Sequence, residues 1–368
     1  MLMLSVFTSL SNIMKSENRQ KQGPALVVAL MILIGLTVIV AVGVGAVEIS
    51  AKQVVHILTK QLGLGLSEVY DDSLRENVVM QIRLPRVFLG LLVGSGLGIA
   101  GALMQGIFRN PLADPGLIGV SSGAALAASL YIVLGDQLVG LVGEWADMVA
   151  TPVCAFFGAL GVTFLVWRMG SIGNRVSVPR LLLAGIAINA LAGAVIGSLT
   201  LVATDSELRD LTFWSLGSLN GATWETVITA ALGILPVMIF APGLARSLDA
   251  WLLGEAEAGH LGVNVVRLKR VAVCTTALAV GSAVAVSGMI GFIGLVIPHL
   301  IRLTLGPGHR FLLPGSALLG ALVLLGSDML ARTLIMPVEI PIGIVTALGG
   351  APFFLLLLHR SRNTGLLG

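Results

Sequence analysis

The stretch VFLGLLVGSGLGIAGALMQGI, residues 87–107, decides the fold. It holds no charged side chain over a length sufficient for an α-helix to cross a hydrocarbon core of about 30 Å. Gly94, Gly98, Ala102 and Gly106 recur every four residues and so share one helical face. Small side chains on such a face let a neighbouring helix approach closely in lipid. The stretch therefore predicts a membrane-spanning helix that packs against other helices.

The rest of the chain has the same character. Of its 368 residues, 56% are hydrophobic and 11% are charged, with a mean hydropathy of +0.98. Soluble domains carry about 25% charged residues, so this composition excludes an ordinary soluble protein. The net charge of +3 is small and dispersed, and we expect no nucleic-acid partner. Cys154 and Cys274 lie inside apolar runs, which favours helix packing over a disulfide or a metal pair.

Ten membrane spans can be drawn along the chain. The first is too long for the apolar region of a signal peptide, about 7–15 residues, and we predict that it is retained. The eighth is the weakest, because Pro298 and several glycines interrupt it. The spans are 25–47, 87–107, 116–134, 149–167, 181–203, 226–243, 271–287, 289–305, 311–327 and 340–358.

The loop charges predict how these spans are oriented. With the N-terminus inside, inner segments hold fifteen of the 22 lysines and arginines, and outer segments hold the other seven. Such an excess marks the cytoplasmic side of a membrane protein. We therefore predict a multi-pass protein of the bacterial inner membrane with both termini in the cytoplasm. Residues 1–24 and 361–368 would be cytoplasmic, and 25–360 would form the membrane domain.

Ionisable groups are scarce in these spans. We assign Arg302 to the inner side and expect no Asp, Glu, Lys or Arg at membrane depth. Proton-coupled carriers and intramembrane enzymes need such groups, and neither HExxH nor GxxxxGK[ST] occurs. We predict no catalytic residue, no metal site and no permanently bound cofactor. If transport here is driven, its energy must come from another polypeptide. Asn189, inside span 181–203, would line a path or form an interhelical hydrogen bond.

One polar segment, RSLDAWLLGEAEAGHLGV at 246–263, interrupts the apolar chain on its inner side. It predicts a short amphipathic helix that breaks at Gly254 and stops near Gly259 and Gly262. Helices that lie on lipid headgroups favour Lys and Arg, and an anionic leaflet repels acids. The acidic face therefore indicates a protein partner. The apolar edge is expected to comprise Leu248, Leu252, Ala256, Leu261 and Val263.

Several blocks resemble one known family. LLGEAEAGHLGV (252–263) is similar to the coupling segment LGxxxAxxLGV of ATP-binding-cassette (ABC) importer permeases. RLPRVFLGLLVGSGLGIAGALMQGIFRNPLADPGLIGVSSGAAL (83–126), 291–332 and 339–358 resemble the FecCD family of iron-siderophore, haem and cobalamin permeases. The resemblance implies an all-α polytopic protein with ten transmembrane helices per subunit and a homodimer with a central translocation path. It also implies two ABC ATPase subunits and a periplasmic substrate-binding protein as partners.

The same resemblance assigns roles to individual residues. Arg83, Arg86 and Arg332 would receive acidic residues of the binding protein, although each could instead be an arginine snorkelling at a span end. Loop 48–86 would be periplasmic, and the sequence leaves its structure open. Segment 246–263 would couple to the ATPase through Asp249, Leu252, Gly254, Glu255, Ala258, Leu261 and Gly262.

Arg209 stands in the outer segment 203–224, which the resemblance makes a periplasmic gate. LRDLTFWSLGSL within it looks most like haem permeases. Two guanidinium groups across a two-fold axis suit the two propionates of haem, and a local pair with Asp205 or Asp210 is the alternative. We predict haem as the substrate, with ferric siderophore or cobalamin as alternatives. A secondary transporter or channel that works without ATP is the alternative of another class.

Overall fold

The structure is a computed structural model of the chain, and it describes residues 19–45, 48–61, 73–135, 144–173 and 175–364. The described residues are almost all helical, with one short hairpin of β1 (Ser171–Ile172) and antiparallel β2 (Arg175–Val176). The longer helices are α2 (Arg19–Gly43), α5 (Leu84–Phe108), α6 (Val120–Leu134), α8 (Glu144–Gly170), α9 (Val178–Leu199), α11 (Trp224–Phe240), α14 (Val265–Ser287), α15 (Ile293–Leu305), α16 (His309–Ala331) and α17 (Ile342–Thr364).

Each of the ten predicted spans coincides with an apolar helix, which confirms the fold class. Among the described residues, seven helices are long and apolar enough to cross a membrane: Gln22–Gly43, Ser73–Phe108, Val149–Gly170, Val178–Leu199, Trp224–Leu252, Val265–Ser287 and His309–Ala331. Three shorter apolar helices occupy the remaining spans: Val120–Leu134, Ile293–Leu305 and Ile342–Leu356.

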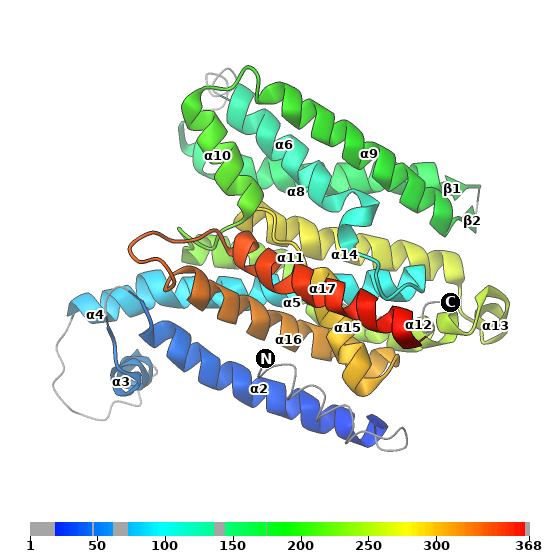
Figure 1. Cartoon of the computed structure of the whole chain (residues 1–368), viewed down its shortest axis with the longest axis horizontal. Coiled ribbons are helices and arrows are strands. Elements are labelled where there is room, and N and C mark those ends of the chain that lie inside the picture. The colour runs from blue at the N-terminus through cyan, green and yellow to red at the C-terminus, as the bar shows by residue number, and fades with distance from the viewer. Residues whose placement is uncertain (1–18, 46–47, 62–72, 136–143, 174, 365–368) are drawn as a thin grey trace.

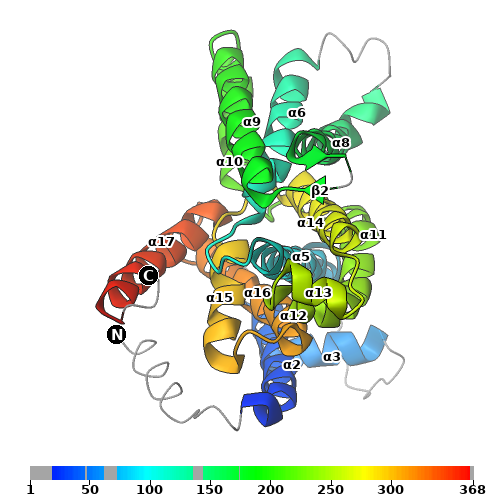
Figure 2. The ribbon, with the colours of Figure 1, turned by 90° about the vertical axis from the view of Figure 1, so that its right-hand side faces the viewer.

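Helix α5 is the centre of the molecule (Figure 2). Helices α11, α14, α15 and α16 surround it and pack against it. A Cβ atom added to Gly94 would meet the carbonyl oxygen of Gly320 in α16, and one added to Gly98 would meet that of Ser316. The face of small residues that the sequence placed here therefore forms the crossing between α5 and α16.

Helices α6, α8 and α9 form a second group, which lies above the first in Figure 1. Helix α14 joins the two groups, because it packs against α5, α6 and α8. The α8 and α9 spans bury much less of their length within the chain than the α5 span does. Large apolar side chains on these two helices therefore face outward, towards lipid or a protein partner.

Helix α15 is shorter than a bilayer, since its 13 residues rise about 20 Å. The chain between α14 and α15 bends at Gly288 and at Phe292, which has the left-handed φ of 68°. Helix α10 (Asp205–Leu216) accepts a hydrogen bond from the backbone of this bend: the N–H of Met289 donates to Trp214 O at 3.3 Å. Non-helical backbone is tolerated at membrane depth only where protein satisfies it in this way.

The segment 48–86, whose structure the sequence left open, contains helices. They are α3 (Ala51–Gln61), α4 (Ser73–Asn77) and the π-helix η2 (Val78–Arg83), which continues into α5. We call this end of the molecule the α4 end (Figure 1). The opposite end, which carries the hairpin and the short helices after α11, is called the α13 end.

Several helices extend beyond the predicted spans and include charged residues. Asp328 lies in the last turn of α16, and Arg302 lies inside α15, so charged side chains do enter the helices. Helix α14 begins at Val265, six residues before the predicted span, because Lys269 is buried by neighbours instead of ending the helix. Helix α17 likewise runs to Thr364, beyond the end of the predicted span 340–358.

Candidate functional site

The polar segment 246–263 forms two short helices at the α13 end. After the 3₁₀ turn η4 (Ala241–Leu244) come α12 (Ala245–Leu252) and α13 (Glu255–His260). Gly254 separates them with a φ of 127°, and Gly262 follows with a φ of 81°, both in the left-handed region that favours glycine. The predicted break at Gly254 is confirmed, and α13 ends at His260, between Gly259 and Gly262, as predicted.

The predicted apolar edge of this segment is wrong. Leu248 is buried, but Leu261 is 63% exposed and Ala256 is also exposed. Trp251 and Ala258 are buried in their place. The reason is the turn at Gly254, which rotates α13 relative to α12, so one helical period cannot describe both.

Trp251 holds α12 against the end of α5. Its side chain is 3% exposed, and its indole N–H donates to Ile107 O at 3.0 Å. The Arg109 guanidinium lies 4.7 Å from the ring centroid, and Lys269 Nζ lies 4.4 Å from it. Both cations are within the range in which an aromatic ring attracts positive charge. Arg109 ends α5 with a left-handed φ of 48°.

Lys269 connects this contact to α13 and to the hairpin. The lysine is buried, a position that is costly unless its charge is compensated. Its Nζ donates to Val176 O at 3.2 Å and lies 3.5 Å from Glu255 Oε2. We call Trp251, Arg109, Lys269 and Glu255 the Trp251 joint. Through this joint the α12–α13 segment is fixed to both α5 and α14.

A second contact fixes α12 to α16. Asp249 Oδ1 accepts from the backbone N–H of His309 at 2.8 Å and lies 2.7 Å from His309 Nδ1. His309 is the first residue of α16, where an anion is favoured by the helix dipole and by the unsatisfied N–H groups. The His309 side chain is buried and fills the space beside Gly106 of α5. One face of the α12–α13 segment is thus anchored, while Leu253, Glu257 and Leu261 stay exposed.

Five charged residues gather at the α4 end, and we call them the Asp328 cluster: Arg83, Arg86, Asp328, Arg332 and Glu339. Arg86 Nε donates to Asp328 Oδ1 at 2.9 Å, and Arg86 Nη1 lies 3.0 Å from Glu339 Oε2. On the other side of Asp328, Arg332 Nε lies 3.4 Å from Oδ2. Asp328 therefore lies between two guanidinium groups.

Arg83 and Arg332 cap the C-terminus of α2. Arg83 Nη1 donates to the carbonyl oxygens of Val42 and Gly43, both at 2.6 Å. Arg332 donates to those of Val44 at 2.9 Å and Ala41 at 2.7 Å. The last carbonyls of a helix have no intrahelical partner, so these two arginines satisfy them and complement the helix dipole. The two side chains are only 5% and 8% exposed.

The remaining two predicted site residues lie apart from both clusters. Arg209 is exposed on α10, and among the described residues it forms neither of the expected pairs with Asp205 and Asp210. Asn189 of α9 donates to Gly116 O at 3.1 Å and accepts from Ser122 Oγ at 2.5 Å. The interhelical hydrogen bond that was one of its two predicted roles is therefore formed.

The sequence analysis missed Trp251, Lys269, Arg109, His309, Asp328 and Glu339 as members of these clusters. Trp251 stands within the quoted segment 246–263, and its burial could have been suspected because buried aromatic side chains contribute strongly to packing. The pairing of Asp249 with His309 had no local signal, since 60 residues separate them. Within the described ranges, no three His, Cys, Asp or Glu side chains gather where they could hold a metal ion.

The helices and the two charged clusters define a polytopic membrane protein with one exposed, anchored segment at one end. The sequence profile described as the FecCD transport family matches residues 30–360. The chain therefore belongs to the FecCD transport family of ABC importer permeases, as its sequence blocks predicted.

Relatives and a solved structure agree with this membership. The hemin transport system permease protein HmuU of Yersinia pestis is 47% identical over 305 residues, 82% of this chain and 90% of that protein. The vitamin B12 import system permease protein BtuC of Klebsiella pneumoniae is 41% identical over 287 residues, 78% of this chain and 84% of that one. The structure of a protein described as a metal-chelate type ABC transporter, in an inward-facing conformation, superposes with a TM-score of 0.77 at 32% identity, covering 92% of this chain and 99% of the other.

Proposed function

We propose that this permease moves haem from periplasm to cytoplasm, driven by a separate ATPase. The observation that carries the proposal is the 47% identity to a hemin permease over 82% of the chain. Identity to the cobalamin permeases is lower, at 41% to 42%. The segment LRDLTFWSLGSL (208–219), which resembles haem permeases, forms most of the largely exposed helix α10 and the turn that follows it. Cobalamin and ferric siderophore are the alternative substrates.

The proposed assembly is a homodimer in the bacterial inner membrane, with both termini in the cytoplasm. Its supporting feature is the outward face of α9, where Leu183, Ile186 and Leu191 are exposed. Gly193 and Gly197 on the same helix have open space beside them. Small residues on an open face allow close helix packing in lipid. Two ABC ATPase subunits would bind at the α13 end, and a periplasmic binding protein at the α4 end.

The α12–α13 segment is the proposed ATPase contact. Its exposed residues Leu253, Glu257 and Leu261 are available to a partner, whereas Trp251 and Asp249 attach the segment to the long helices. A push on this segment would reach α5, α14 and α16 together. The ATPase would shift the transporter between its two states only if its contact with the segment differs between them.

For the residues of the outer side we propose the roles that the family resemblance implies, and a separate observation supports each role. Arg209 is exposed, which suits a gate residue facing anionic substrate. Asn189 is already hydrogen-bonded, so a path role would have to include those bonds. Of the three docking arginines, Arg86 has the most accessible partner, since the Glu339 side chain is 37% exposed. An acidic residue of the binding protein would compete with Glu339 for Arg86.

Uptake by proteoliposomes tests the substrate. The complex purified with its ATPase and binding protein is supplied with haem, cobalamin or a ferric siderophore, with and without ATP. We expect ATP-dependent haem uptake, a loss of at least tenfold in Arg209→Ala, and a smaller loss in Arg209→Lys, which keeps the charge but not the planar fork. If the Arg209→Ala variant takes up haem as fast as the wild type, Arg209 is not a gate residue. Uptake without ATP would support a secondary transporter.

Cross-linking tests the ATPase contact. In a background without Cys154 and Cys274, the exposed Leu261 and the exposed Ile172 of the hairpin are each replaced by cysteine. We expect Leu261→Cys to cross-link to the ATPase with a short reagent, and Ile172→Cys at the same end to remain unlinked. Equal labelling at both positions, or at neither, contradicts the assignment of α12–α13.

A further inference from the structure

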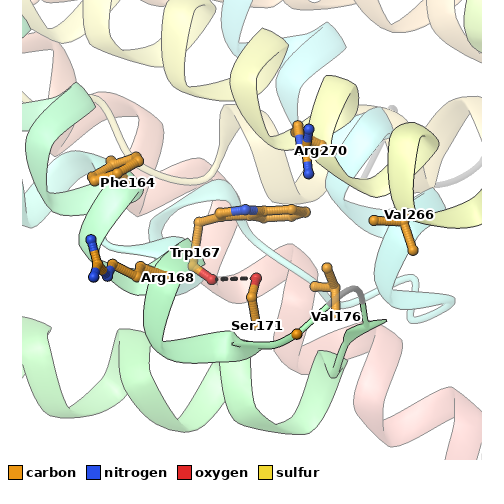
Figure 3. Close-up of a pocket in the computed structure, with 8 residues that line it drawn as sticks. Phe164, Trp167, Arg168, Ser171, Val176, Val266 and Arg270 are labelled. Carbon is orange, nitrogen blue, oxygen red and sulfur yellow. Dashed lines mark hydrogen bonds between the residues drawn. The ribbon is translucent and has the colours of Figure 1, made fainter.

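Phe213 of α10 is an aromatic side chain whose ring is open to the outside of the chain. It is 53% exposed, and among the described residues it takes part in no ring pair and no cation–π contact. Phe88, which is also exposed at the α4 end, packs against Trp224 with 5.8 Å between the ring centroids. At the α13 end, Figure 3 shows the Trp167 ring with Arg270 on one side and the hairpin on the other, along a cavity of about 380 Å³. Unlike these rings, Phe213 keeps its face free for a ligand.

The surface of α10 that surrounds Phe213 is otherwise polar. Ser206, Arg209 and Asp210 precede it by seven, four and three residues, so they lie on the same side of the helix, and all three are exposed. Arginine and aspartate are costly in hydrocarbon, so this surface faces water and the ring is not there to meet lipid. Aromatic residues and arginine are among the types enriched at binding surfaces.

Arg209 and Phe213 can act on one ligand together. Residues four apart on a helix are neighbours, with about 5–6 Å between their Cβ atoms. Within the described part of the chain, Arg209 has no ion pair, and its guanidinium does not lie over the Phe213 ring. A ligand that combines a flat ring with an anionic group would therefore find an open aromatic face and an unpaired cation side by side.

Both side chains stand on a helix whose other face is held in place. Leu211 is buried on that face, and Trp214 O accepts from the backbone N–H of Met289 at 3.3 Å. Directly after α10, Gly217 O accepts from the N–H of Ile342, the first residue of α17, at 3.0 Å. A binding pair on a fixed element keeps its spacing before the ligand arrives, which lowers the cost of binding.

We propose that Phe213 is a specificity-determining residue for a flat aromatic substrate that carries carboxylates. Its ring stacks on the macrocycle while Arg209 pairs with a carboxylate. This inference rests on the proposed function and deepens it. Haem has both features, because its porphyrin is flat and aromatic and bears two propionates. The side chains of the cobalamin ring are amides, and a ferric siderophore offers no extended flat ring, so neither uses both groups.

Haem uptake by proteoliposomes that hold the permease, its ATPase and the binding protein tests the role of the ring. Phe213→Leu keeps an apolar side chain without a flat ring, and uptake at subsaturating haem should fall about three- to tenfold, the share that aromatic stacking adds to burial. Phe213→Trp supplies another flat ring and should stay within about twofold of the wild type. The matched control Phe157→Leu removes an exposed ring of α8 and should leave uptake unchanged.

Haem dimethyl ester separates the ring from the charge, because it keeps the macrocycle and lacks both carboxylates. The wild type should prefer haem over the ester, and Arg209→Ala should lose this preference. Phe213→Leu should slow the uptake of both compounds by the same factor, because both contain the ring. The binding protein is the same in every reaction, so a difference between variants in the ratio of the two rates comes from the permease.

Three results would overturn the inference. One is wild-type haem uptake in Phe213→Leu, and another is a loss in Phe213→Trp as large as in Phe213→Leu, which would show a requirement for size instead of stacking. The third is a Phe213→Leu variant that no longer prefers haem over the ester, since the residue would then act only through Arg209. If the wild type takes up cobalamin but no haem, the proposed substrate fails as well. If the wild type and Phe213→Leu take up haem equally, the inference fails alone.

Discussion

The two ends of this molecule use the same residue types for opposite purposes. In the Asp328 cluster, arginines and acids are paired with each other and with helix carbonyls, and most of them are buried. In the Trp251 joint, Lys269 and Arg109 flank an aromatic ring, and Glu255, the acidic partner of Lys269, is exposed. One end therefore fixes helices to one another, and the other end fixes one face of a segment while leaving its other face open.

The difference shows that burial of the acidic group, more than the identity of the charges, decides what such a cluster does. A buried charge that loses its partner destabilises the fold strongly, whereas an exposed pair contributes little. Changes in the Asp328 cluster should therefore affect stability first. Changes in the Trp251 joint should affect the transmission of movement first. Four experiments examine this contrast, from the largest expected effect to the smallest.

Removing the charge of Asp328 should have the largest effect. In Asp328→Asn, Arg86 and Arg332 keep their buried charges with no carboxylate between them, and the free energy of unfolding should fall by about 3–5 kcal/mol. Denaturant or thermal unfolding in detergent measures it. The control is Glu339→Gln, which removes the exposed partner of Arg86 and should cost less than about 1 kcal/mol. Equal losses in the two variants would mean that burial does not distinguish them.

The second largest effect is expected in α5, the helix that runs between the two ends of the molecule. In Gly98→Ala, the new methyl group meets Ser316 O, so α5 and α16 must separate. We expect a loss of about 1–3 kcal/mol in the free energy of unfolding, as for overpacked cores. Gly161→Ala in α8 is the control, because nothing lies within 4 Å of its added Cβ. Full stability in Gly98→Ala would show that the α5–α16 crossing is loose.

The Trp251 joint should show a coupling effect with little loss of stability. Trp251→Phe removes the hydrogen bond to Ile107 O, worth about 1 kcal/mol, and weakens the attraction of the two cations. We expect the substrate moved per ATP hydrolysed to fall a fewfold in proteoliposomes. Trp224→Phe at the α4 end loses the equivalent bond to Met80 O, of 2.9 Å, and should leave this ratio unchanged. If Trp251→Phe and Trp224→Phe move the same amount of substrate per ATP hydrolysed, the Trp251 joint does not transmit movement from the ATPase.

Asp114, in the loop after α5, should show the smallest effect, and this effect depends on pH. Burial raises the pKa of Asp114 above its ordinary value, and the N–H of Gly116 offsets this only in part. A raised carboxyl pKa contributes stability that is present below the unfolded pKa and is lost as pH rises through the folded pKa. Asp114→Asn keeps an acceptor for Gly116 and should be the more stable protein at pH 7.5.

Unfolding temperatures between pH 4 and 8 check the Asp114 effect. The advantage of Asp114→Asn should shrink as pH falls, because the wild-type carboxyl is then protonated in both states. A gap that stays constant with pH would point to a packing change instead.

Much of the fold could be predicted from the sequence because a helix in lipid forms its backbone hydrogen bonds within its own segment. The face with Gly94 and Gly98 indicated a close helix contact, and that contact is the crossing with α16. The boundaries were less predictable where charges are buried. Lys269 reads as a loop residue until Trp251, 18 positions away, is seen to cover it. The partner of that face, α16, could not be chosen from the sequence, because several apolar helices offered small residues.

The candidate sites divide in the same way. The acidic segment with Gly254 was visible as a break in an apolar chain, and its two short helices followed from glycine positions. Its anchored face could not be predicted, because Asp249 meets His309 and Trp251 meets Ile107 only after α12 has packed against α16 and α5. The sequence also placed Arg83 and Arg332 correctly near one end, but gave no indication that they cap α2.

The sequence by itself therefore determined the class of protein and the order of its helices, since lipid obliges each apolar segment to satisfy its own backbone hydrogen bonds. Only the tertiary structure decided which charges are buried and which remain available to a partner. The physical reason is distance along the chain: Arg86 and Asp328 are 242 residues apart, and no local pattern records that they meet.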